Sequence, residues 1–102
     1  MLAILPTMKA ALILRERREQ MDGSIIEMVI WRLDQPVKPC SHPFKYRLVL
    51  VRNGRRLIGF DNERGKDDHQ HRRGLEFPYQ FTSIDKLMDD FIREIERWRG
   101  ER

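Results

Sequence analysis

KYRLVLVRNGRRLIGFD, residues 45–61, contains the strongest structural pattern in the chain. Apolar and polar side chains alternate from Lys45 to Arg52, as in a strand whose two faces have different surroundings. Asn53 and Gly54 follow directly, and this pair favours the positive φ angles that a two-residue hairpin turn requires. Residues 55–61 are therefore expected to return as the second strand of an antiparallel hairpin.

Further strands and a helix are predicted on both sides of this hairpin. Residues 9–18 and 25–33 flank a turn signal and form a second hairpin pattern, because the later segment is rich in β-branched and aromatic residues. A short aromatic segment at 77–81 is expected as an edge strand, since Pro78 cannot donate a hydrogen bond to a neighbouring strand. Apolar side chains at 84–98 recur every three or four residues, which predicts a C-terminal amphipathic helix.

The order of these elements predicts an α+β fold, an antiparallel β-meander of about four to five strands with the helix packed on one face. A chain of 102 residues suffices for one domain, which we expect at residues 8–102. Residues 1–7 are interpreted as a loose N-terminal extension, with Met8 as the alternative start. This apolar stretch is too short for a membrane span or a signal-peptide core, so we expect no membrane association.

The composition indicates which class of partner the chain is expected to bind. Twenty Lys and Arg against 16 Asp and Glu give a net charge of +4, which favours nucleic acid, with RNA as the expected partner. Cys40 is the only cysteine, so no internal disulfide is expected and a cytoplasmic location is predicted. Residues 34–43, rich in proline and containing Cys40 and His42, are interpreted as a connecting loop.

Candidate functional residues gather at residues 61–76, which lack apolar periodicity and are expected to form a long polar loop. His69 and His71 are two residues apart, so on extended backbone their imidazoles point the same way and can converge on one site. Lys66 adds an ammonium group nearby. The candidates proposed for catalysis are His69, His71, Lys66 and Asp68.

This set fits the cleavage of RNA without a metal ion or other cofactor. The reaction needs a base to take the proton of the 2′-hydroxyl, an acid to protonate the leaving 5′-oxygen, and cations to hold the phosphate. His69 and His71 are the candidate acid–base pair, and Asp61 or Asp68 can orient an imidazole. The candidates for binding the substrate, including a tyrosine for base stacking, are Arg64, Arg72, Arg73, Tyr79, Asp61 and Asn62.

Other interpretations stay open. The carboxylates and imidazoles offer oxygen and nitrogen ligands, so a metal-dependent nuclease could use the same cluster. The chain could instead be a non-catalytic module that binds nucleic acid or docks a partner protein. The polar segment could also be a solvated connection whose opposite charges offset one another. A homo-oligomer is left open as well.

Several short motifs resemble the TumE-type toxin family of bacterial toxin–antitoxin systems. They are residues 8–10, 22–28 and 46–47, above all the block from Phe60 to His71, and then Tyr79-x-Phe81 and the terminal helix. The resemblance spans about residues 8–98 and implies a growth-inhibiting toxin with a helix-turn-helix antitoxin as its partner; RNA cleavage is our inference from the side chains. Asp67 stands where a second glycine is expected, and its carboxylate would repel a phosphate.

Overall fold

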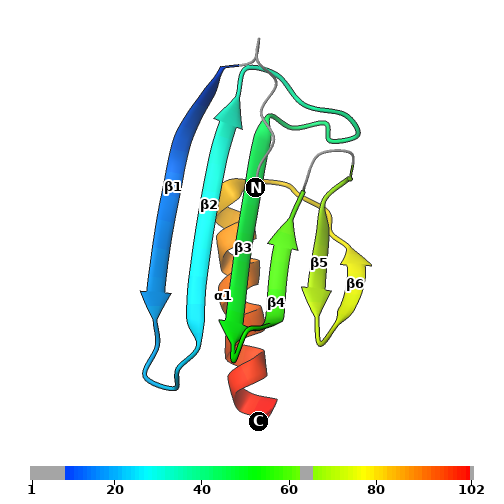
Figure 1. The fold of residues 1–102 in the computed structure, drawn as a ribbon. Coiled ribbons are helices and arrows are strands. Elements are labelled where there is room, and N and C mark those ends of the chain that lie inside the picture. The colour runs from blue at the N-terminus through cyan, green and yellow to red at the C-terminus, as the bar shows by residue number, and fades with distance from the viewer. Residues whose placement is uncertain (1–8, 63–65, 102) are drawn as a thin grey trace.

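The computed structural model describes residues 9–62 and 66–101, so the extension expected at residues 1–7 lies outside the described residues. The described part contains an antiparallel sheet and a C-terminal helix (Figure 1). The elements are β1 (Ala10–Glu19), β2 (Ile25–Leu33), β3 (Phe44–Arg52), β4 (Arg55–Asp61), β5 (His69–Arg72), β6 (Leu75–Pro78) and α1 (Ile84–Glu101). Within these ranges the strands follow chain order across a six-stranded meander. The predicted α+β fold is confirmed, and the sheet has more strands than the four to five expected.

Two tight turns of the same kind join the last four strands of the sheet in pairs. Asn53 and Gly54 join β3 to β4 with φ angles of 53° and 73°, as the sequence pattern predicts. Arg73 and Gly74 join β5 to β6 with φ angles of 51° and 78°. The prediction of a long polar loop over residues 61–76 is therefore wrong for its second half. There the polar side chains lie on a short hairpin, and the expected edge strand at 77–81 is placed earlier, at Leu75–Pro78.

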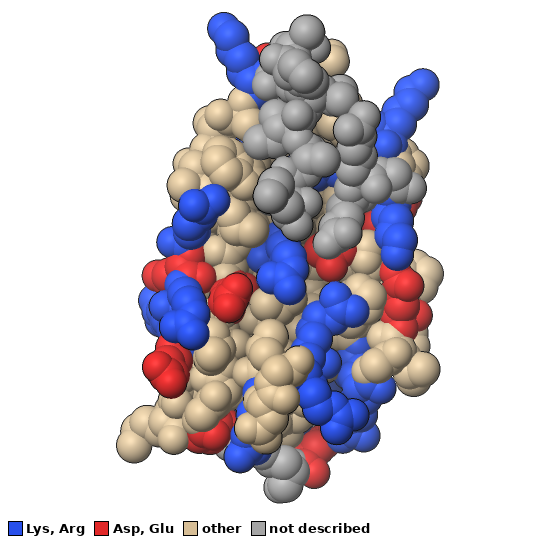
Figure 2. Space-filling model, viewed as in Figure 1, with Lys and Arg blue, Asp and Glu red and all other residues tan. Residues whose placement is uncertain are grey.

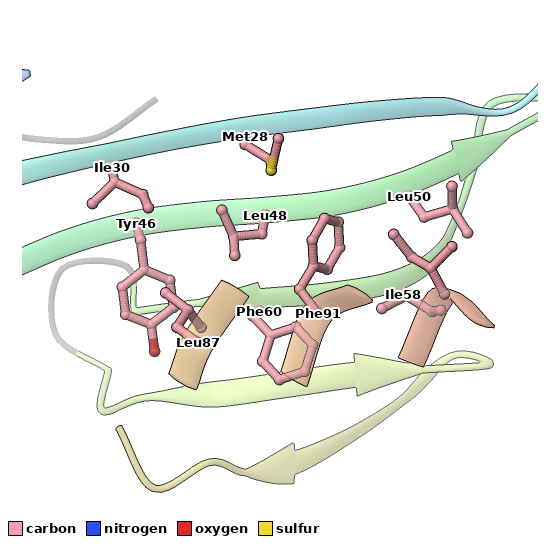
Figure 3. Packing of buried hydrophobic residues seen from close by; sticks show 10 residues of the cluster. Met28, Ile30, Tyr46, Leu48, Leu50, Ile58, Phe60, Leu87 and Phe91 are labelled. Atoms are coloured by element: carbon pink, nitrogen blue, oxygen red, sulfur yellow. The ribbon is translucent and has the colours of Figure 1, made fainter. Parts of the chain in front are cut away.

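The core lies between the sheet and α1. Ser83 caps the helix, since its hydroxyl oxygen accepts a hydrogen bond from the Lys86 backbone N–H at 3.1 Å. Figure 3 shows the apolar side chains of the central strands meeting those of the helix. The buried cluster consists of Met28, Ile30, Tyr46, Leu48, Leu50, Ile58 and Phe60 from the sheet and Leu87, Phe91 and Ile95 from α1.

The other face of the sheet, here called the open face, carries the alternate residues of each strand and faces the viewer in Figure 1. Strand pairing aligns these residues in rows that run across the sheet. One row is Arg15, Val29, Arg47, Asp61, His69 and Pro78. The next row is Arg17, Glu27, Val49, Gly59, His71 and Glu76. Both histidines of β5 thus lie on the open face, as the sequence predicts.

Candidate functional site

Asp61, at the end of β4, and His69, at the start of β5, face each other on the open face. Nε2 of His69 lies 2.5 Å from Oδ1 of Asp61 and 3.4 Å from Oε1 of Glu76. Nδ1 of His69 donates a hydrogen bond to the backbone carbonyl of Asp67 at 2.8 Å. Because a carbonyl only accepts, Nδ1 carries a hydrogen, and Nε2 points at the two carboxylates with either a lone pair or a second proton.

The contact between Asp61 and His69 is buried and incomplete. The two side chains are only 3% and 9% exposed. Oδ1 of Asp61 has no hydrogen-bond partner among the described residues, since its short approach to Nε2 lacks the geometry of a hydrogen bond. The Asp61 carboxylate therefore has a buried oxygen that no donor of the described residues satisfies.

His71 adds a second imidazole beside His69. Its ring lies 4.9 Å from that of His69, at an interplanar angle of 79°. Its Nδ1 accepts a hydrogen bond from the Arg56 guanidinium at 2.9 Å, so Nε2, which is 3.8 Å from Oδ2 of Asp61, carries the hydrogen. Burial and then the charge of Arg56 lower the pKa of His71, which keeps this ring neutral at neutral pH.

Gly59 allows Arg56 to reach the site. A Cβ atom on Gly59 would lie 3.0 Å from Cδ of Arg56 and 3.6 Å from Cδ2 of His71. The missing side chain therefore lets Arg56 lie across the strand, with Nη1 4.0 Å from Oδ2 of Asp61. Arg56 is not among the residues predicted from the sequence. A glycine inside a strand often marks such a close approach, and Gly59 was the available signal.

Lys66 lies at the rim of the site, where it pairs with Glu76. Glu76 was not predicted from the sequence either. Nζ of Lys66 is 3.8 Å from Oε1 of Glu76, the same oxygen that approaches His69. An open hollow beside His69 is lined by Lys66, Asp67, Asp68, His69, Glu76, Phe77 and Pro78. The carboxylate of Asp67 accepts a hydrogen bond from the Asp68 backbone N–H at 2.8 Å. The hollow thus opens onto His69.

The Asp68 side chain is bound to other partners than the histidine pair. Its Oδ1 accepts a hydrogen bond from the Tyr46 hydroxyl at 2.6 Å, and Nε2 of His42 lies 2.8 Å and 3.0 Å from its two oxygens. Burial alone would raise the pKa of Asp68, but the hydrogen bonds from His42 and Tyr46 outweigh it and lower the pKa overall. Asp68 therefore orients His42, and Asp61 is the carboxylate that faces His69 and His71.

The Asn62 side chain also has a structural role, because it is hydrogen-bonded to the backbone of β3. Its side-chain oxygen accepts a hydrogen bond from the Tyr46 backbone N–H at 3.0 Å, and its amide nitrogen donates to the Phe44 carbonyl at 2.7 Å. The same nitrogen lies 3.6 Å from the sulfur of Cys40, whose pKa is raised chiefly by burial. These contacts hold the end of β4 against β3 and leave Asn62 buried.

The remaining candidates lie away from the histidines. Arg72 pairs with Glu94 at 3.5 Å and Arg73 pairs with Glu101, both on α1. The Tyr79 hydroxyl donates to Asp90 at 2.6 Å, and its ring packs edge-on against Phe60 in the core. Arg64 lies outside the described residues. The described part of the site thus consists of Asp61, His69 and His71 with Arg56, Glu76 and Lys66.

Two groups of side chains in the described ranges have metal-ligand spacing, each with its ligand atoms within 4.8 Å of one another. They are Cys40, His42 and Asp68, and Asp61, His69 and His71. In the first group the carboxylate and both imidazole nitrogens are engaged in hydrogen bonds. The second group contains the oxygen of Asp61 that lacks one. If a metal binds, the second group is the better candidate.

Fold and site together define a small α+β protein with a cluster of acid–base groups on the face of its sheet opposite the helix. Over residues 8–99 the chain matches the family described as Toxin TumE. It belongs to the TumE toxin family, and it is the toxin of a toxin–antitoxin system, which implies an antitoxin partner. No curated protein and no solved structure matches the chain. In the described part of the chain, no helix is long and apolar enough to cross a membrane.

Proposed function

We propose that this toxin cleaves RNA without a metal ion, at the site formed by Asp61, His69, His71 and Arg56. The observation that carries the proposal is the arrangement of two imidazoles around one buried carboxylate. His71, whose pKa is lowered, is the neutral ring that can accept a proton. His69 is assigned the role of the acid, because its Nε2 faces the carboxylates of Asp61 and Glu76 at 2.5 Å and 3.4 Å.

The chemistry assigns each group one role. Arg56 is 40% exposed, so it can turn from His71 to a substrate phosphate and free the lone pair on Nδ1. Nδ1 takes the proton of the ribose 2′-hydroxyl, and the 2′-oxygen forms a bond to phosphorus. The bond to the 5′-oxygen breaks, and that oxygen takes a proton from Nε2 of His69. The products are a 2′,3′-cyclic phosphate and a 5′-hydroxyl.

Asp61 and the cations support this reaction. Oδ2 of Asp61 faces the Nε2–H of His71 and stabilises the imidazolium that forms there. Arg56 and Lys66 supply positive charge for the pentavalent phosphate. Asp61 is thus a positioning residue, which acts on the substrate through both imidazoles.

A metal-dependent nuclease at the same three residues is the second candidate. It is favoured by the buried oxygen of Asp61 that lacks a hydrogen bond and by the spacing of the ligand atoms. The Arg56 contact argues against it. While Arg56 donates to Nδ1 of His71, the hydrogen stays on Nε2, which is the nitrogen that faces Asp61.

The test is cleavage of an end-labelled RNA by the purified toxin in excess EDTA. We expect a 2′,3′-cyclic phosphate product, a loss of about 100-fold or more in rate for His69→Ala and His71→Ala, and an unchanged rate for the control Arg73→Ala. Cleavage only after addition of Mn²⁺ or Zn²⁺ establishes the second candidate. If the histidine variants still arrest growth and bind RNA in a salt-dependent way, the toxin is a non-catalytic binding module.

The antitoxin is proposed to be a helix-turn-helix protein, and RNA cleavage would place the toxin in the cytoplasm. The family supports an antitoxin partner without specifying its type. A neighbouring reading frame that encodes a helix-turn-helix protein, and that suppresses the toxicity when both are expressed, is the expected result. Suppression by a partner of another class contradicts it.

A further inference from the structure

Two arginines, Arg47 on β3 and Arg15 on β1, lie in the row that runs across the open face from the candidate site. We infer that this row binds single-stranded RNA laid across the strands, so that the bond to be cleaved lies between His69 and His71. The inference rests on the proposed function and adds the form of the substrate and the path that it takes.

The register of the sheet gives the path. Arg47 on β3 is the direct neighbour of Asp61, and Arg15 on β1 lies two strands further in the same row. Adjacent strands are about 4.8 Å apart, which places Arg47 about 10 Å and Arg15 about 19 Å from β5. This span covers several nucleotides. A single strand can therefore contact both guanidinium groups while one of its phosphates lies at the histidines.

The two arginines of this row are not held in ion pairs. Neither Arg15 nor Arg47 forms an ion pair with any residue in the ranges 9–62 and 66–101. On the helix side, by contrast, Arg72 and Arg73 form ion pairs with glutamates of α1. Figure 2 views the open face and shows Lys and Arg side chains over its middle. Arg15 is exposed and Arg47 is half-buried, and an unpaired cation that reaches solvent is available to a phosphate.

Trp31 supplies an aromatic surface beside this row. It lies on the open face of β2, and the Arg15 guanidinium is 5.9 Å from the centre of its ring. Aromatic rings next to basic side chains are the usual platform on which proteins stack the bases of single strands. Tyr79, the stacking candidate from the sequence, is packed in the core on the helix side. Trp31 is better placed for that role.

The binding test uses the full chain with His69→Ala, which prevents cleavage. A fluorescent 12-nucleotide single-stranded RNA is titrated with this protein, and its anisotropy is recorded at several salt concentrations. Adding Arg15→Ala or Arg47→Ala is expected to weaken binding about threefold to tenfold and to reduce the salt slope by about 0.7. Trp31→Ala is expected to weaken it about tenfold, and Trp31→Phe less. The control is Arg73→Ala.

A kinetic test separates this inference from the proposed function. With His69 intact, Arg15→Ala and Arg47→Ala are expected to raise KM for the 12-nucleotide RNA and to leave cleavage of a dinucleotide unchanged. If the wild type cleaves nothing but the row binds RNA, the proposed function fails and the inference stands. If all variants bind RNA as the parent does, the inference fails. Loss of antitoxin binding alone would assign the row to an acidic segment of the antitoxin.

Discussion

Two pairs of histidine and aspartate lie on either side of one backbone segment, and they differ in how completely they are bonded. In the pair His42 and Asp68, both carboxylate oxygens and both ring nitrogens have hydrogen-bond partners, and the Phe81 ring lies 3.9 Å from the imidazole. In the pair His69 and Asp61, one buried oxygen lacks a hydrogen bond and the imidazole borders an open hollow.

The difference shows how to distinguish a structural pair from a reactive one when both have the same residue types. Asp68 and His69 are neighbours in the chain, yet their side chains belong to different pairs. A pair whose hydrogen bonds are complete stabilises one conformation and gains nothing from a ligand. A pair that is buried and incomplete retains the capacity to take up or release a proton.

The largest expected effect is the loss of stability on breaking the complete pair. Asp68→Ala removes the acceptor of Tyr46 and His42 and leaves both polar groups buried without a partner. We expect the free energy of unfolding to fall by about 3 kcal/mol, which urea denaturation measures. Asp89→Ala, at an exposed carboxylate on α1, is the control. A loss below about 1 kcal/mol would show that the Asp68 pair is not the structural one.

Asp61→Asn tests the incomplete pair, where we expect a loss of activity and little change in stability. The amide can donate a hydrogen bond to Nε2 of His69, so the short contact is relieved and stability is expected to change by less than about 1 kcal/mol. The rate of RNA cleavage is expected to fall about 100-fold, because the imidazolium that forms on His71 then lacks the carboxylate oxygen that faces its Nε2. Cleavage by this variant at the wild-type rate would exclude the role given to Asp61.

Patterns formed by residues close together in the sequence predicted the structure correctly. The central hairpin, the terminal helix and the common face of His69 and His71 follow from alternation, turn residues and helical spacing, which depend on near neighbours. β5 was missed because it is polar and only four residues long, and β6 was expected two residues later, at 77–81. Arg73 with Gly74 was the turn signal that could have revealed them.

The partners of the candidate residues could not be predicted, because they depend on pairing between strands. Asp61 and Asp68 looked equivalent in the sequence, and only the course of the chain between β4 and β5 directs one to His69 and the other to His42. Arg72 belongs to the helix side for the same reason, since it alternates with His71 along β5. A one-residue shift in register would exchange these faces.

The complete pair also predicts a dependence of stability on pH. The pKa of Asp68 in the folded protein lies below its usual value of 3.8, so the carboxylate binds protons less readily when folded than when unfolded. Its contribution is therefore fully present above that value and is lost as the pH falls through the folded pKa. In urea denaturation, the stability difference between the wild type and Asp68→Asn is expected to shrink on acidification below about pH 4. A difference that is constant down to pH 2 contradicts this.

The smallest effect concerns the incomplete pair and isolates the contribution of one cation. Arg56→Gln removes the charge that, after burial, lowers the pKa of His71, so the pKa should rise part of the way toward its usual value of 6.5. The His71 ring signal in NMR spectra should then titrate at higher pH, and the acid limb of the cleavage profile should move the same way, since the ring must be neutral to act as a base. Arg73→Gln, whose guanidinium pairs with Glu101, is the charge-matched control. An unchanged titration in Arg56→Gln would mean that burial alone sets the proton affinity of His71, and Arg56 would keep only its role at the phosphate.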